Sequence, residues 1–200
     1  GLLFTIKLPN PKQVKETTPG TTRKVITKNK FLFLSLLLRH IGAAAVWVIL
    51  PIMIVEKLGG ELYNISIVYT ANTVTAFILM NVMASKIHLS NVTKFKIGIG
   101  STTFVFVGLS VVTEWWMAMP FMALVGATWA FLFIGGNFHL MENNPRSTST
   151  GIFSSTLSIA TVVGPVVAGS IAFLFDYTAV MYFAIVIIIC AFVVSLKIKK

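Results

Sequence analysis

The amino-acid sequence predicts an all-α membrane protein with six transmembrane helices. Hydrophobic residues make up 56% of the 200 residues and charged residues only 11%, whereas ordinary soluble domains carry about 25% charged residues. The mean hydropathy of +0.88 is far above what a soluble core needs. The apolar residues fall into six runs, each close to the roughly 20 residues that cross a bilayer. No apolar alternation at period two is sustained, so the sequence does not support a β-barrel.

The chain before these runs divides into two segments. Residues 1–6 are apolar and are interpreted as the tail of a preceding membrane helix, which would make the sequence a fragment or a half-length product. Residues 7–30 are polar, with seven Lys or Arg against one Glu. Such a segment buries too little apolar surface to fold as a unit. We therefore expect a mobile cytoplasmic linker, although basic juxtamembrane segments also attract anionic headgroups. We expect residues 31–200 to form a bundle of six transmembrane helices.

The predicted spans are separated by short polar loops with interfacial aromatic residues. Trp115 and Trp116 follow Glu114, and Tyr177 follows Asp176, where aromatic side chains mark the membrane–water boundary. The spans are residues 31–55, 62–83, 95–112, 117–138, 151–175 and 180–196.

The distribution of Lys and Arg between the spans predicts the orientation. Fourteen lie in the first linker, in alternate loops and at the C-terminus, whereas the opposite loops contain only Lys57. Cytoplasmic loops carry an excess of Lys and Arg. Both ends of the chain are therefore expected in the cytoplasm of a multi-pass protein of the cell membrane.

Arg39 and His40 are the exception to the apolar character of the first span. A buried arginine costs at least a few kcal/mol, so it normally faces a cavity or a partner. His40 and Trp47 are seven residues apart, hence on one helical face. An imidazole with an ordinary pKa of about 6.5 changes charge in the physiological range, which makes His40 a candidate for proton coupling. The alternative is that Arg39 extends its side chain to the inner interface, roughly 13 Å away.

Other spans contribute fewer polar candidates, and none contains Asp or Glu. Glu114 and Asp176 lie at outer edges and are interpreted as solvated loop acids. The polar or aromatic candidates for a binding cavity are Tyr69, Asn72, Trp129 and Asn137. A single Asn in a membrane helix can equally form an interhelical hydrogen bond.

The fifth span has small residues at helical spacing. Ala160, Gly164 and Ala168 recur every fourth residue and share one face, where small side chains let membrane helices approach closely. Pro165 removes a backbone hydrogen bond and kinks the helix. This face is predicted to pack tightly against another helix.

The order of several short motifs resembles the major facilitator superfamily of secondary transporters. The motifs are Asn144-Pro145-Arg146, Thr150-Gly151-Ile152, Gly164-Pro165 and Gly169, preceded by Leu38-Arg39-His40-Ile41-Gly42 and Leu50-Pro51. The resemblance covers nearly the whole chain, as the C-terminal six-helix half of a transporter. It implies that the first, second, fourth and fifth spans line a central cavity, with the third and sixth outside. It adds Gly151 and Gly169 to the packing residues.

The resemblance implies a secondary active transporter that moves a small solute by alternating access. The missing N-terminal six-helix half and the bilayer would be its partners, and proton-coupled drug or metabolite transport, for example by an antiporter, is one form of this function. The alternative is a self-contained six-helix channel or membrane scaffold. We expect no enzyme, because HExxH, GxSxG and paired intramembrane carboxylates are absent from the sequence. No cofactor, metal or nucleic acid is expected, and Cys190, the single cysteine, excludes an intrachain disulfide.

Overall fold

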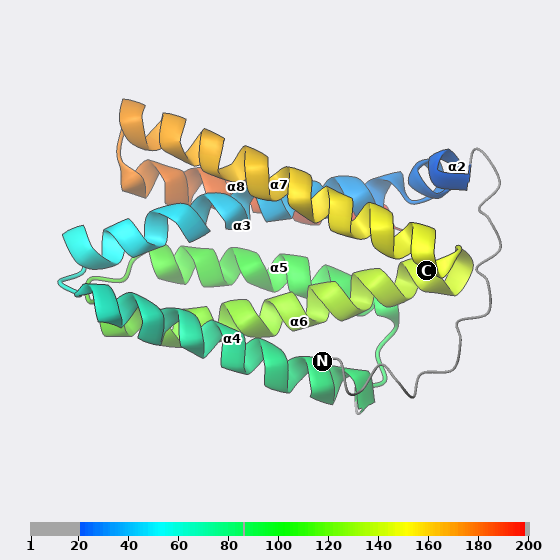
Figure 1. Cartoon of the computed structure of the whole chain (residues 1–200), viewed down its shortest axis with the longest axis horizontal. Coiled ribbons are helices and arrows are strands. Elements are labelled where there is room, and N and C mark those ends of the chain that lie inside the picture. The colour runs from blue at the N-terminus through cyan, green and yellow to red at the C-terminus, as the bar shows by residue number, and fades with distance from the viewer. Residues whose placement is uncertain (1–20, 86, 199–200) are drawn as a thin grey trace, which may run out of the picture.

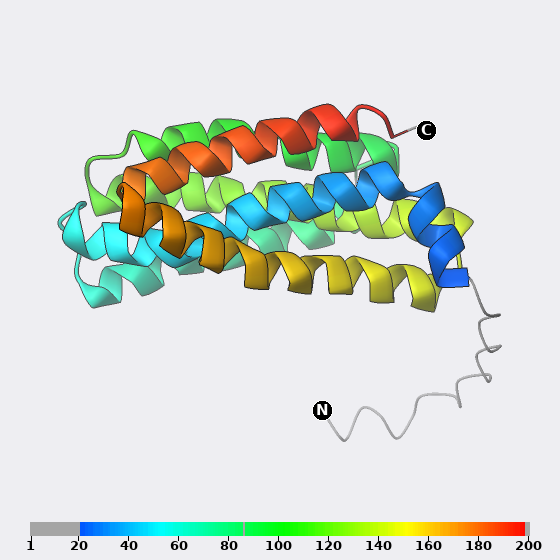
Figure 2. The same ribbon diagram turned by 90° about the horizontal axis from the view of Figure 1, so that it is seen from above.

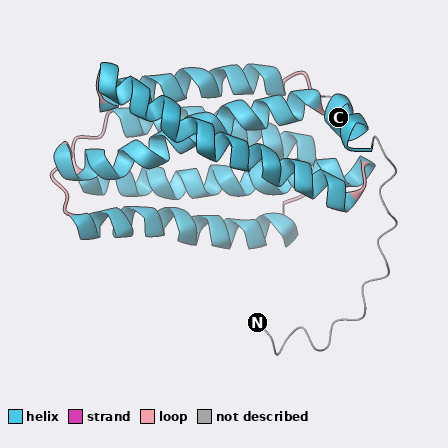
Figure 3. Cartoon of the chain, turned by 45° about the horizontal axis from the view of Figure 1, so that its top comes forward, coloured by secondary structure: helices cyan, strands magenta, loops and turns pink. Residues whose placement is uncertain are grey.

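The computed structural model describes residues 21–85 and 87–198, and all of the secondary structure there is helical (Figure 3). Six of its helical segments are long and apolar enough to cross a bilayer. They are α3 (Lys30–Glu56), α4 (Leu62–Ser85), α5 (Asn91–Ser110), α6 (Ala118–Asn143) with the preceding 3-10 turn η1 (Trp115–Met117), α7 (Arg146–Leu174) and α8 (Tyr177–Ser195). The chain is thus an all-α, multi-pass membrane protein. The expected tail over residues 1–6 and the first part of the linker lie outside the described residues.

Several helices extend beyond the predicted spans at the end of the bundle where α3, α5 and α7 begin. α5 begins at Asn91 rather than at residue 95, because the Ser90 side chain caps it by accepting a hydrogen bond from the Thr93 N–H at 3.2 Å. α6 continues to Asn143, and α7 begins at Arg146. Hydropathy identifies the part of a helix that crosses the hydrocarbon core, whereas hydrogen bonding and capping decide where the helix ends.

The long helices are arranged around α3 and α6 (Figure 1). α3 packs against α7 and α8, and α6 packs against α4 and α5. α5 and α8 also contact each other and lie along one side of the bundle, with α4 and α7 toward the other side (Figure 2). α3 and α6 therefore form the centre, and the more exposed α4 and α7 flank them.

Small residues bring the helices together. A Cβ built on Gly164 of α7 would lie 2.6 Å from the Ala44 Cβ and 2.8 Å from the Ile41 carbonyl oxygen of α3. Ala160 and Ala168, one turn to either side, are fully buried. Gly151 and Gly169 differ, since a Cβ on either would have no neighbour within 4 Å in the described chain. The tight contact of α7 is thus centred on Gly164, next to Pro165.

The structure separates charges between the two ends of the bundle. The described acids Glu56, Glu61, Glu114 and Asp176 and the single cation Lys57 lie near the loops at one end. The opposite end has one described acid, Glu142. Its described cations are Arg23, Lys24, Lys28, Lys30, Lys94, Lys96, Arg146 and Lys197. We call these the acidic end and the basic end.

A short helix at the basic end was not anticipated from the sequence. α2 (Thr21–Lys28) lies in the segment predicted to be an unstructured linker. It contacts α7 and the start of α3, and its Val25 side chain is only 3% exposed. A helix of only eight residues, six of them polar, is marginal alone. The burial of Val25 against the bundle supplies the tertiary contact that holds this helix in place.

Candidate functional site

A cavity of about 150 Å³ lies between α3, α4 and α6 in the interior of the bundle. Five of the seven predicted binding residues line it together with Val125: Arg39, His40, Trp47, Asn72 and Trp129. The sequence analysis also expected α7 to line the cavity. The residues that line this cavity come from α3, α4 and α6. The cavity is therefore the place where the polar residues of the apolar spans converge.

Arg39 is buried in the bundle, with a relative exposure of 2%. Its Nε and Nη2 atoms donate hydrogen bonds to Thr102 Oγ1 of α5, at 3.4 and 3.2 Å. The Thr102 hydroxyl in turn donates to the Gly98 carbonyl at 2.6 Å. The guanidinium carbon lies 5.6 Å from the centroid of the Trp129 ring, within range of a cation–π interaction. Arg39 therefore spans α3, α5 and α6.

The side chain of Arg39 does not extend toward the helix end. Arg39 is nine residues from the start of α3, and Thr102 is eleven residues from the start of α5, at the same end of the bundle. At 1.5 Å per residue, these positions are about 14 and 17 Å from the ends. Because the hydrogen-bond partner is at least as deep as Arg39 itself, the charge is held inside the bundle.

No carboxylate in the described part of the chain forms an ion pair with Arg39. Two ion pairs between described residues lie at the ends of the bundle: Lys57 with Asp176 at 3.5 Å, and His139 with Glu142 at 3.9 Å. A neutral hydroxyl and an aromatic face offset only part of the cost of a buried guanidinium. The site thus holds a fixed positive charge without a counter-charge among the described residues.

Trp129 is the centre of an aromatic wall. The His40 ring lies 5.5 Å from the Trp129 ring, and Phe133 continues the wall on the other side at 5.4 Å. His40 Nδ1 is buried and has no hydrogen-bond partner among residues 21–85 and 87–198. The wall therefore combines aromatic faces with a buried ring nitrogen whose hydrogen-bonding capacity is not used by the described residues.

Tyr69 donates a hydrogen bond to a backbone carbonyl of α3 that Pro51 leaves without a helical donor. Proline has no N–H, so Pro51 leaves the carbonyl of Trp47, four residues earlier, without its usual helical donor. The Tyr69 hydroxyl of α4 donates to this carbonyl at 2.8 Å, and the Tyr69 and Trp47 rings are in tilted contact with their centroids 4.5 Å apart. Tyr69 was predicted to bind substrate. In the structure its hydroxyl is used to join α4 to α3 beside the cavity.

The two predicted asparagines also have partners within the protein. Asn72 Nδ2 donates to the Met122 carbonyl of α6 at 3.3 Å, so this residue lines the cavity and joins two helices. Asn137 Nδ2 donates to the Phe133 carbonyl of its own helix at 3.0 Å. Asn137 is buried outside the lining of this cavity.

Thr102 is the residue of the site that sequence reasoning missed. It is fully buried, and it lies on the helix that was expected to be peripheral. The sequence signal was weak, because Ser101, Thr102 and Thr103 are adjacent and only one of them faces Arg39. The pairing links residues 63 positions apart, which no local spacing rule detects.

The groups around the cavity can contact a ligand through charge, hydrogen bonds and aromatic faces. Across the described residues, no group of three or more His, Cys, Asp or Glu side chains is placed to hold a metal ion. A guanidinium, an imidazole nitrogen, an amide and two indoles instead surround the cavity.

Comparison with known proteins does not identify the chain, since no family model and no curated protein matches it.

Proposed function

We propose that the chain is the C-terminal half of a major facilitator-type secondary transporter that moves a small amphipathic organic anion across the membrane. The observation that carries this proposal is Arg39, a buried cation beside a cavity with no carboxylate partner among the described residues. Charged residues within membrane spans mark substrate or ion pathways. A structural arginine would need a counter-charge or access to water. In a transport site, a bound anionic substrate would supply this counter-charge to Arg39 for as long as it is bound.

The cavity lining supports an anion with an apolar body. Arg39 can donate charge-assisted hydrogen bonds to a carboxylate, which are worth about 1.5–3 kcal/mol each. The faces of Trp47, Trp129 and His40 offer an apolar surface for a ring or an alkyl chain. A neutral solute of the same shape would keep the apolar contact with the rings but lose the charge-assisted hydrogen bonds from Arg39. The substrate class is therefore distinguished by its charge.

Alternating access supplies the transport step. In this mechanism two six-helix halves rock around a site between them. α4 and α7 leave apolar side chains such as Phe77 and Val162 exposed, and these faces are available to a second half or to lipid. The orientation follows from the charges: the basic end would lie in the cytoplasm and the acidic end outside. Within this frame Arg39 sits in the cytoplasmic half of the cavity.

Ligand binding to the purified chain tests the site. Benzoate is the probe, benzamide is its neutral counterpart, and the fluorescence of Trp47 and Trp129 is the signal. We expect saturable quenching by benzoate and none by benzamide. Thr102→Val should weaken benzoate binding about tenfold, since the guanidinium loses the hydroxyl that positions it, whereas Thr102→Ser retains the hydroxyl and should bind as the wild type. Equal quenching by benzamide would contradict an anion site.

Reconstitution distinguishes the transporter from a self-contained channel. Proteoliposomes containing the chain alone are expected to show no benzoate uptake, because half of the cavity wall is missing. Addition of a complementary six-helix half should produce saturable uptake. Non-saturating flux from the chain alone would favour the channel.

A further inference from the structure

We propose that the outer surface of α2 binds the headgroups of anionic phospholipids at the basic end of the bundle. We define this surface by the four described residues that line a hollow of about 590 Å³: Arg23, Lys24, Thr27 and Lys28. The inference is independent of the transport proposal, because it concerns how the chain meets the bilayer surface.

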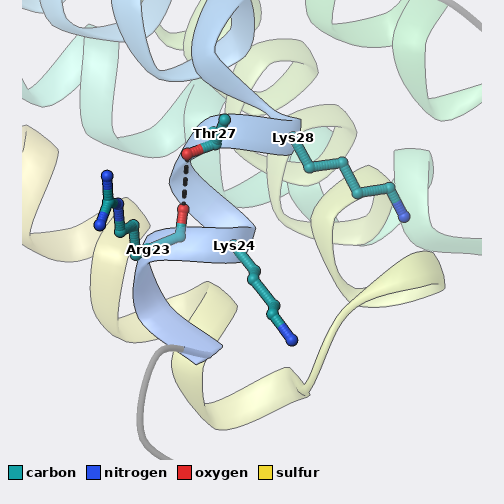
Figure 4. Close-up of a pocket in the computed structure, with 4 residues that line it drawn as sticks. All are labelled: Arg23, Lys24, Thr27 and Lys28. Atoms are coloured by element: carbon teal, nitrogen blue, oxygen red, sulfur yellow. Dashed lines mark hydrogen bonds between the residues drawn. The ribbon is translucent and has the colours of Figure 1, made fainter.

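The α2 surface is built on a helix that is anchored on one side and free on the other. Val25 is buried, and the Thr27 hydroxyl donates to the Arg23 carbonyl at 2.8 Å, which ties the last turn to the first. Arg23, Lys24 and Lys28 project away from the helix axis in different directions (Figure 4). The fixed backbone thus presents three cations around one hollow.

The charge around this surface is almost entirely positive. Neither Arg23 nor Lys24 forms an ion pair with a described residue. Glu142, the acid that the structure describes at this end, accepts a hydrogen bond from Asn91 Nδ2 at 2.5 Å and pairs with His139, and Lys28 is the α2 cation whose charge acts on this pair. Lys30 and Arg146 are at the adjacent starts of α3 and α7. The surface is therefore complementary to an anionic partner.

The position of α2 favours lipid headgroups over a soluble anionic partner. α2 leads directly into α3, whose apolar span begins at Phe31, so it lies at the level where the hydrocarbon core ends. It runs across the ends of the long helices rather than along them (Figure 2). Ile26 is 42% exposed among the cations. A helix in the membrane plane with apolar and basic side chains binds at the boundary between headgroups and acyl chains.

Each exposed Lys or Arg near an anionic membrane surface strengthens binding about fivefold. Removing Arg23 and Lys24 together should then lower the apparent affinity for an anionic lipid about 30-fold. The attraction should also weaken when salt rises from about 0.1 to about 1 M, because the Debye length falls from ~10 to ~3 Å. A mixed bilayer that half-saturates the wild type should leave the double variant almost unbound.

The test uses the full chain in vesicles, with Cys190→Ser and Ile26→Cys to place one environment-sensitive fluorophore on α2. Vesicles of phosphatidylcholine with phosphatidylglycerol should shift its emission to the blue and protect it from acrylamide, a neutral quencher. Pure phosphatidylcholine should do neither, and inorganic phosphate should not substitute for the anionic lipid. Arg23→Gln with Lys24→Gln should abolish the shift, whereas Lys57→Gln at the acidic end should leave it unchanged.

Three results would overturn the proposal. An equal shift in both lipid mixtures would mean that protein or neutral lipid covers α2. A shift produced by inorganic phosphate in neutral vesicles would assign the cations to a soluble anion. A shift that survives both Gln substitutions, or salt at about 1 M, would exclude an electrostatic origin. The lipid comparison needs no change to the basic residues, so it decides the question even where a variant fails to insert.

Discussion

The hydrogen bond between Tyr69 and the carbonyl that Pro51 frees makes a sharp stability prediction. Tyr69→Phe retains the ring that contacts Trp47 and removes only the hydroxyl, which donates to the Trp47 carbonyl at 2.8 Å. The carbonyl is then left without a donor inside the bundle. A buried acceptor without a partner costs about 1–3 kcal/mol, whereas hydrogen bonds between membrane helices average about 0.6 and reach about 1.7 kcal/mol. We expect a loss of about 1 kcal/mol in the free energy of unfolding.

A double-mutant cycle with Pro51→Ala isolates this contribution. Alanine restores the N–H at residue 51, so the Trp47 carbonyl regains its own helical donor. Tyr69→Phe should then cost close to nothing in the Pro51→Ala background. The expected coupling energy is about 1 kcal/mol, or roughly a fivefold change in the ratio of folded to unfolded protein.

The assay is reversible unfolding in mixed micelles of a mild detergent and dodecyl sulfate, followed by circular dichroism. Tyr63→Phe is the matched control, because Tyr63 lies on the same helix and is 61% exposed. It should leave stability unchanged. An equal cost for Tyr69→Phe in both backgrounds would refute the argument that this hydroxyl compensates for the proline.

Three further predictions concern packing, topology and pH. Gly164→Leu should abolish folding or activity, because its side chain would collide with the backbone of α3. Val166→Leu, on the exposed face of α7, should be tolerated in a thermal-unfolding assay. Equal tolerance of both variants would show that α7 does not pack against α3 at Gly164. In a Cys190→Ser background, a cysteine in place of the exposed Glu61 should react with an impermeant thiol reagent on intact cells. A cysteine in place of the exposed Leu89 should be protected. Labelling at residue 89 would contradict the predicted orientation. The Ala179 N–H, which donates to the Asp176 carboxylate at 2.7 Å, lowers the pKa of Asp176, and Lys57 adds to this effect. The stability from this group is therefore present at neutral pH and lost as pH falls through the lowered pKa, so Asp176→Asn should flatten the acid side of a plot of Tm against pH; an unchanged acid side would exclude this carboxylate as its source.

The sequence was sufficient for the fold class because hydropathy alone identifies bilayer-crossing helices. All six predicted spans correspond to long helices, and the differences are at their ends. Capped by Ser90, α5 begins at Asn91, four residues before its predicted start, which a hydropathy pattern does not register. α2 was missed for a related reason. Its composition is that of a linker, and its stability depends on a single side chain, Val25, packed against the bundle.

The candidate site was predictable in part. Arg39, His40 and Trp47 were identifiable because polar and large aromatic residues stand out in an apolar span, and the structure brings them to one cavity. Their partners were not identifiable. The contact of Arg39 with Thr102 depends on how α3 and α5 pack, and the role of Tyr69 depends on which carbonyl Pro51 frees. Spacing rules describe one helix at a time, whereas both of these contacts cross between helices.

Uptake by Arg39 variants tests the central proposal most directly. Labelled benzoate would be added outside proteoliposomes that contain the chain and a complementary six-helix half, and its uptake would be measured at matched protein levels. We expect saturable uptake by the wild type, partial uptake by Arg39→Lys, which retains the charge but loses the planar fork of donors, and none by Arg39→Leu. Benzoate uptake by Arg39→Leu equal to that of the wild type, or a wild type without saturable uptake, would contradict the assignment of Arg39 to an anion site.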